Sequence, residues 1–88
     1  MNCDSIDFAT TLLSTDAAVL SKIKRGDRLQ VRRGDFSAIV VTDEGDRVGS
    51  IVTNAVQLLT CMASGRSYVA EVLEVADGAC RVRIAHKG

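Results

Sequence analysis

Arginine is the residue type with the clearest chemical use in this sequence. Arg28 and Arg32 lie in a segment in which apolar and polar residues alternate, at positions whose side chains would point to the same face of a strand. The same holds for Arg81 and Arg83 in a second such segment. A guanidinium group binds phosphate oxygens in a bidentate manner, so such arginines on one sheet face would follow a nucleic-acid backbone. With two further arginines and a tyrosine for base stacking, the candidate nucleic-acid-binding residues are Arg28, Arg32, Arg33, Arg47, Arg81, Arg83 and Tyr68.

Charge is unevenly distributed although its sum is zero. The chain has 11 basic and 11 acidic residues; residues 22–33 hold six basic side chains and one acidic one, whereas residues 34–46 hold four acidic side chains and no basic one. A second interpretation is therefore open, in which the arginines are solvated strand faces that pair with Glu71 or Glu74 across the sheet. The neutral sum favours this second interpretation, and the first requires arginines of distant segments to meet on one side.

The sequence has few residues that are suited to nucleophilic catalysis or metal binding. The one histidine, His86, lies next to the C-terminus, and the three cysteines, Cys3, Cys61 and Cys80, have no C-x-x-C spacing. We expect these cysteines to be buried or terminal free thiols rather than bridges, and we expect no metal site. The glycines have neither of the spacings typical of phosphate-binding loops. The sequence predicts no enzyme, no catalytic residues and no cofactor.

Length and hydropathy indicate a single domain without a membrane segment. The chain has 88 residues, no linker-like tract and no repeat, so we expect one domain over residues 1–88. Its longest apolar runs, 17–20 and 38–41, are far shorter than the roughly 20 residues that cross a bilayer. The acidic N-terminal sequence is unlike a signal peptide, which favours a cytoplasmic location.

Hydrophobic periodicity predicts two helices and several strands. Residues 16–25 have helical spacing between an N-cap at Ser14 or Thr15 and a C-cap at Gly26. A second helix follows an N-cap at Thr53 or Asn54, carries an apolar stripe, and ends at Gly65. The stripe comprises Val56, Leu59 and Met62, joined by Leu58. The predicted strands are 27–33, 36–42, 47–52, 67–75 and 79–85, with turns at Gly34-Asp35, 43–46 and Asp77-Gly78.

These elements predict a β-rich α+β fold, namely a small, partly open barrel of five or six strands related to the OB and SH3 types, with two short helices. The first 13 residues are expected to add an edge strand or to be loosely ordered. Gly49, inside a predicted strand, indicates a bulge or a close backbone approach that serves packing rather than ligand binding.

Two segments resemble a known family pattern. Asp35-Phe36-Ser37-Ala38-Ile39-Val40-Val41 and Val48-Gly49-Ser50-Ile51 are similar to the D-x-x-A-I-x-V and V-G-x-I/L patterns of the HIRAN family. Ala55, Leu58, Leu59 and Gly65 look like that family's helix with its terminal glycine, and 69–75 looks like its returning strand. The resemblance covers roughly 50 residues and implies a small barrel that binds single-stranded DNA ends. Family members stack bases on aromatic residues, of which this chain has only Phe8, Phe36 and Tyr68.

Two functions follow as expectations. The first is a non-catalytic HIRAN-like module that binds single-stranded DNA weakly through its arginines. The second is a protein-interaction or homodimerisation domain without nucleic-acid binding, because a core of this size would gain stability from further burial. Exposure of Tyr68 or Phe36 favours the first function, and core placement of both favours the second. We expect Tyr68 to be partly buried because an apolar strand follows it.

Overall fold

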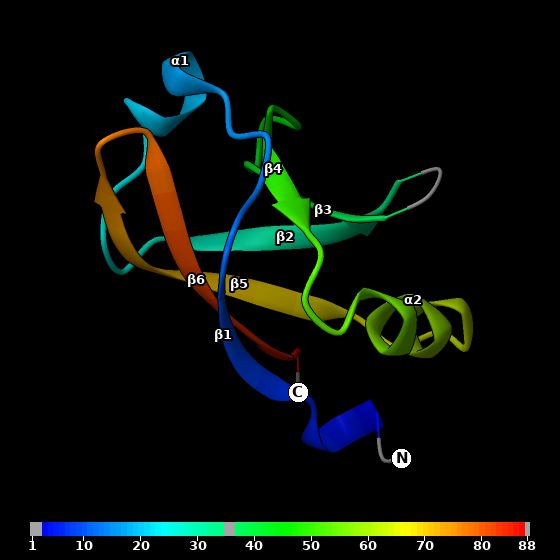
Figure 1. Ribbon diagram of the computed structural model, residues 1–88. Coiled ribbons are helices and arrows are strands. Elements are labelled where there is room, and N and C mark those ends of the chain that lie inside the picture. Colours follow the sequence, from blue (N-terminus) through cyan, green and yellow to red (C-terminus); the bar gives the residue numbers. More distant parts are fainter. Residues whose placement is uncertain (1–2, 35–36, 88) are drawn as a thin grey trace.

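Six antiparallel strands form one sheet in the order β1-β6-β5-β2-β3-β4. The computed structural model describes residues 3–34 and 37–87 (Figure 1). The strands are β1 (Asp7–Thr11), β2 (Arg28–Arg33), β3 (Ala38–Val41), β4 (Arg47–Ile51), β5 (Tyr68–Ala76) and β6 (Ala79–His86). The helices are the 3₁₀ turn η1 (Cys3–Ser5) and the α-helices α1 (Ala17–Leu20) and α2 (Ala55–Ala63).

The sheet curls until the chain beyond one edge strand meets the other edge strand. Leu13, just after β1, pairs with Ser50 of β4 through N–H···O distances of 2.9 and 2.8 Å. The Asp16 N–H then donates to the Val48 carbonyl at 3.2 Å, which extends this seam. The predicted class is confirmed as a β-rich, partly open barrel of six strands with two short α-helices. The N-terminal segment supplies the predicted edge strand, β1.

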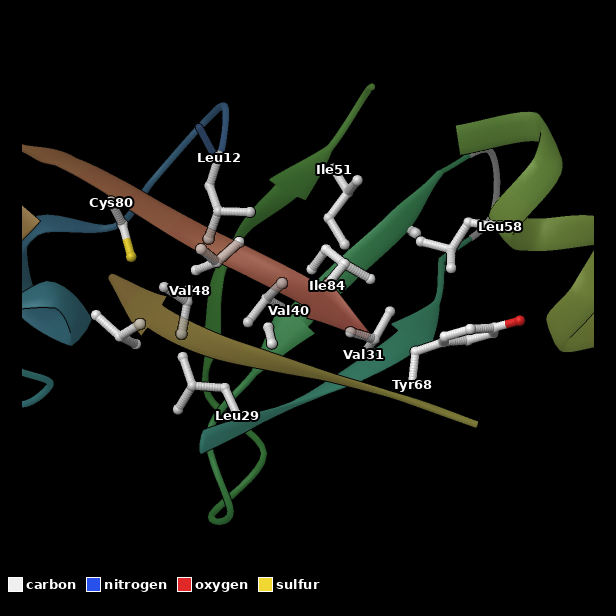
Figure 2. Close-up of a cluster of buried hydrophobic side chains, with 14 of the residues drawn as sticks. Leu12, Leu29, Val31, Val40, Val48, Ile51, Leu58, Tyr68, Cys80 and Ile84 are labelled. Atoms are coloured by element: carbon white, nitrogen blue, oxygen red, sulfur yellow. The ribbon is translucent and has the colours of Figure 1, made fainter. Parts of the chain in front are cut away.

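Side chains on the concave face of the sheet form the core (Figure 2). Leu29 and Val31 of β2 alternate with exposed arginines, and Val82 and Ile84 of β6 do the same. Leu58 of α2 is fully buried and packs against the open end of the barrel beside Tyr68 (Figure 2). Each such side chain contributes about 1.5–3 kcal/mol through removal from water.

The hairpin turns agree with the sequence prediction where they are described. Asp77 and Gly78 have φ values of 52° and 78°, so this two-residue turn has the left-handed conformation that matches strand twist. Thr42 and Asp46 close the β3–β4 turn with an N–H···O distance of 2.9 Å. The turn predicted at Gly34-Asp35 falls partly outside the described residues, since it includes Asp35.

The first α-helix is shorter than predicted and has a different cap. Asp16, rather than Ser14 or Thr15, is the N-cap, because its Oδ1 accepts the Ala18 N–H at 2.9 Å. The helix ends at Leu20, and Gly26 does not cap it. The Gly26 N–H instead donates to the Val72 carbonyl of β5 at 2.8 Å, so a tertiary contact determines this segment.

The second α-helix ends as predicted but presents a different face. Gly65, with φ of 102°, and Arg66 donate their N–H groups to the carbonyls of Met62 and Cys61, a glycine-terminated helix cap. Asn54 is the N-cap, although its side chain makes no capping hydrogen bond. The predicted stripe is wrong at Val56, which is 81% exposed, and the buried residues are Leu58 and Cys61.

No helix within the described ranges has the length and apolar character needed to cross a bilayer.

Gly49 lies where strand β4 meets the chain after β1. A Cβ atom there would be 2.9 Å from the Leu12 Cβ and 3.1 Å from the Leu13 carbonyl oxygen. The register also shifts on the facing strand between Val40 and Val41. The predicted close backbone approach is therefore confirmed, and the glycine serves packing.

Gly49→Ala is expected to lower the free energy of unfolding by about 1–3 kcal/mol, the usual cost of overpacking. Urea denaturation measures it. Val52→Ala, at a half-exposed position three residues further on, is the matched control and should change stability by less than about 0.5 kcal/mol. Equal effects of the two substitutions would contradict a tight seam at Gly49.

Candidate nucleic-acid interface

Four of the candidate arginines lie on the convex face of the sheet. Arg28 and Arg32 of β2 and Arg81 and Arg83 of β6 are all exposed and alternate with core residues. Strand β5 separates the two pairs, so Arg28 and Arg83 are about 10 Å apart by the spacing of neighbouring strands. The arginines therefore share one side of the molecule but come from strands that are not adjacent.

Acidic residues of β5 lie between these arginines. Glu71 is the register partner of both Arg28 and Arg83. Glu74 is the partner of Arg81. Directly opposed unlike charges attract across a sheet, which is the arrangement expected for solvated strand faces. The convex face is thus an alternating charge pattern rather than a continuous basic stripe.

Arg83 is engaged by the edge strand β1. Its Nε lies 2.8 Å from the Asp7 Oδ1, and its Nη2 donates to the Asp7 Oδ2. The hydrogen bond from Arg83 is the main reason that the pKa of Asp7 is lowered, and the same bond raises the pKa of Arg83. This two-point pair holds β1 on β6 and leaves Arg83 less available to a ligand.

Asp7→Asn is expected to lower the melting temperature at neutral pH and to have no effect in strong acid. The folded-state pKa lies below the ordinary value of 3.8, so the pair stabilises the fold above that pH and loses its effect as the pH falls through the folded-state pKa. The effect is small because both groups are exposed. Thermal melts of wild type and variant across the acid range measure it, and a difference that persists in strong acid contradicts it.

The other two predicted arginines, Arg33 and Arg47, are not available on this face. Arg47 donates to the Ser14 carbonyl at 3.1 Å and to the Ser50 Oγ at 2.7 Å, so it joins β4 to the chain after β1. Arg33 is exposed at the end of β2, with the parity of the core residues Leu29 and Val31. Arg33 therefore does not share the convex face with Arg28. Arg47 does, since it pairs with Val41 and Val41 pairs with Gln30, but its guanidinium group is already engaged by these two hydrogen bonds.

Tyr68 is buried and cannot stack on a base in this conformation. Its side chain is only 3% exposed, and its hydroxyl donates to the Cys3 carbonyl at 2.7 Å. Its ring meets the His86 ring edge-on, with centroids 5.6 Å apart. Burial raises the pKa of the phenol. The structure thus removes Tyr68 from the predicted interface, and it is more deeply buried than the sequence suggested.

A groove of about 470 Å³ lies between β2 and the start of β5. Arg28 and Gln30 line it from β2, Ser67 and Lys87 line it from the segments that flank β5 and β6, and the carboxylate residue Asp43 also lines it. Sequence reasoning missed Ser67 and Lys87. The Asp77-Gly78 turn was the available signal, because it sets the hairpin in which the Lys87 N–H donates to the Ser67 carbonyl at 2.9 Å.

Three arginines on the convex face are unpaired. Within residues 3–34 and 37–87, Arg28, Arg32 and Arg81 form no ion pair. Arg32 donates to the neighbouring Gln30 Oε1 at 3.4 Å. These three guanidinium groups, with Lys87 in the neighbouring groove, are positive groups that can contact a ligand on this side of the molecule.

Two of the three cysteines are bridged, contrary to the sequence prediction. Cys3 of η1 and Cys61 of α2 form a disulfide with a Cα–Cα distance of 5.5 Å. Their spacing of 58 residues carries no pairing signal, and the bridge depends on η1 docking against α2. Cys80 is a buried free thiol, as predicted, and burial raises its pKa, which disfavours the reactive thiolate.

Metal-ligating side chains do not cluster in the described part of the chain. It holds no group of three or more His, Cys, Asp or Glu side chains that could bind a metal ion. The His86 Nε2 lies 3.4 Å from the Asp4 Oδ1, so the histidine faces η1 rather than a nucleophile.

The chain matches no protein-family model, no curated protein and no solved structure. The HIRAN-like pattern therefore depends on the residues of the chain itself. Ala38, Ile39 and Val41 of that pattern lie on β3, and Val48 and Gly49 lie on the paired strand β4. Asp35 and Phe36, which begin the pattern, lie outside the described residues.

Proposed function

We propose that the chain is a non-catalytic, HIRAN-like module that binds single-stranded DNA weakly through the convex face of its sheet. The observation that carries the proposal is the presence of Arg28, Arg32 and Arg81 on one face without ion-pair partners among the described residues. Phosphate is the ligand that such groups bind in a sequence-independent manner. The groove beside Arg28 adds Lys87 and the neutral polar side chains of Gln30 and Ser67.

The acidic residues of β5 explain why the proposed binding is weak. Glu71 and Glu74 would face the same backbone that the arginines attract, and the net charge of the chain is zero. Binding of this kind requires low ionic strength, because surface charges are screened over roughly 10 Å at 0.1 M salt.

Fluorescence anisotropy with single-stranded and 3′-overhang DNA tests the proposal. If three arginines contact phosphates, the logarithm of the association constant should fall with the logarithm of the salt concentration with a slope of about −2. Arg28→Gln/Arg32→Gln should reduce this slope to about −0.7, since only one phosphate contact then remains.

Lys24→Gln/Arg25→Gln is the matched control. It removes the same charge from the exposed turn before β2 and leaves the convex face intact, so the slope should not change. Absence of binding, binding without a salt slope, or equal losses in the two double variants would each refute the proposed site.

A specific observation favours homodimerisation as a second candidate function. Leu13, Val52 and Val56 are the large hydrophobic side chains that are at least half exposed in the described part of the chain. Leu13 pairs with Ser50, two residues before Val52, and Val56 follows one helical turn later. Exposed apolar side chains that gather in one patch are typical of contact surfaces.

Sedimentation equilibrium separates the two candidates. A dimer that uses these residues should dissociate on dilution, and Val52→Ser/Val56→Ser should make it monomeric while leaving DNA binding unchanged. A monomer at all concentrations removes this second candidate.

We further propose that the protein works in the cytoplasm, where single-stranded DNA is available. Disulfides are rare there because thiol reductants keep cysteines reduced, and those that form are mostly transient or redox-sensing. This location makes the Cys3–Cys61 bridge the feature whose role most needs an explanation.

A further inference from the structure

The N-terminal turn η1 is attached to the rest of the fold mainly by groups on its surface. The Cys3–Cys61 disulfide joins it to α2, and the Tyr68 hydroxyl donates to the Cys3 carbonyl. The Asp4 Oδ1 lies 3.4 Å from the Arg66 Nε and 3.4 Å from the His86 Nε2. None of the residues of η1 is buried. The disulfide is therefore the covalent cross-link between this turn and α2.

We infer that the Cys3–Cys61 disulfide is a redox-controlled clasp, and that its reduction releases η1 from the end of the groove. The turn covers the hydroxyl end of Tyr68 and places the Asp4 carboxylate beside Arg66 and His86. Tyr68 and His86 also line the groove that Arg28 and Lys87 share. Opening the clasp therefore changes both the shape and the charge of this end of the groove.

The reducing co-reactant is a thiol, most simply a dithiol. A thiolate attacks the Cys3 sulfur, because Cys61 is only 1% exposed and Cys3 is half-buried, and Cys61 leaves as a thiolate that takes up a proton. The second thiol of the reductant then displaces Cys3 from the mixed disulfide. Cys3 and Cys61 each gain one hydrogen, and the dithiol becomes a disulfide.

The ion pairs that Asp4 forms with Arg66 and His86 attach η1 only weakly once the bridge is open. Both ion pairs of Asp4 involve side chains that are not buried, and such pairs contribute little. A three-residue 3₁₀ turn has poor hydrogen-bond geometry of its own. Ile6 is buried in the core, so we expect the chain from Ile6 onward to stay attached to the barrel when η1 is released. The barrel itself does not depend on η1.

The charge change connects the clasp to nucleic-acid binding, and this step rests on the proposed function. In the closed state the Asp4 carboxylate offsets Arg66 next to the groove. In the open state Arg66 loses this carboxylate, which moves away with the chain, at the end of the groove that His86 lines. The reduced protein is therefore the form with the higher affinity for single-stranded DNA.

Tyrosine fluorescence tests the clasp without any DNA. The chain has one tyrosine and no tryptophan, so the emission reports on Tyr68 alone. Acrylamide quenching of this emission should rise severalfold when the oxidised full-length protein is treated with dithiothreitol. Far-UV circular dichroism should keep its β-sheet signal. Alkylation followed by mass measurement should find two newly reactive thiols, Cys3 and Cys61, while the buried Cys80 stays protected.

A permanently open variant is the matched control. Cys3→Ser/Cys61→Ser should show the high quenching of the reduced protein in the presence and absence of reductant. Unchanged quenching after complete reduction would refute release of η1. Loss of the β-sheet signal on reduction, or in the double variant, would also refute the clasp, because the bridge would then maintain the whole fold.

DNA binding is measured separately on the same samples. The reduced protein should bind single-stranded DNA about two- to fivefold more tightly at low salt, the size of effect expected for one exposed ion pair. Increased quenching without DNA binding in either state refutes the proposed function and leaves the clasp intact. Equal affinity in both states, with increased quenching, refutes only the link between them.

Discussion

Reduction of the Cys3–Cys61 bridge is expected to lower the free energy of unfolding by about 4 kcal/mol. The two cysteines are 58 residues apart in the sequence, so the bridge closes a long loop in the unfolded chain. In the chain-entropy description, opening a loop of this size returns about 4 kcal/mol of conformational entropy to the unfolded state. Urea denaturation of oxidised and reduced protein measures the difference.

The reduced protein is nevertheless expected to remain folded. A domain of this length typically has about 4–13 kcal/mol of stability, and the core residues of the barrel lie outside η1. Cys3→Ser/Cys61→Ser should have the stability of the reduced protein and should not respond to reductant. A further loss of stability in this variant on adding reductant would show that the effect does not come from the bridge.

Leu58→Ala is expected to cost about 2–5 kcal/mol, the range for a buried leucine that leaves a cavity. Leu58 is fully buried where α2 covers the open end of the barrel, next to Tyr68 (Figure 2). The helix has one other buried residue, Cys61, and Leu59 and Met62 pack against the core only in part, so Leu58 supplies its most deeply buried apolar side chain. Urea denaturation again provides the measurement.

Val56→Ala is the control on the same helix. Val56 is 81% exposed, two residues before Leu58, so its truncation should change stability by less than about 0.5 kcal/mol. Comparable losses at both positions would contradict the importance of burial at the barrel end, and helix propensity would not explain them because alanine is the best helix former. Near-neutral results at both would show that α2 does not close the core.

The strands were predictable because their signals are local. Leu29 and Val31, like Val82 and Ile84, alternate with charged residues, and only a sheet with one buried face satisfies that pattern. The Asp77-Gly78 turn was equally clear, because both residues adopt the positive φ that this pair favours. The fold class followed from these local features.

The errors share a different cause, namely contacts between segments far apart in the sequence. The first helix stops at Leu20 because the chain beyond it bonds to Val72 of β5 through Gly26. The Cys3–Cys61 bridge likewise depends on where η1 docks. Val56 fits the helical spacing of the stripe, but a helix of nine residues buries only a narrow face.

The exposure of the individual arginines was predictable from the sequence, but the sequence did not decide the pattern of charges on the surface that they form. Alternation correctly places Arg28 and Arg83 on exposed strand faces. It does not reveal that β5 lies between β2 and β6, which sets Glu71 between the two arginines. Strand order is a property of the whole sheet, so the placement of Glu71 and Glu74 opposite the arginines was one of two open interpretations until the topology decided it.

The contact between Asp4 and His86 brings the two ends of the chain together at one end of the barrel (Figure 1). A short linker between them would therefore span little distance, and new termini in the exposed β3–β4 turn would leave every strand pair intact. Domains with this geometry tolerate circular permutation and insertion into a surface loop of a host protein. The domain could thus be inserted into a host protein, because the two points at which it joins the host chain would lie close together.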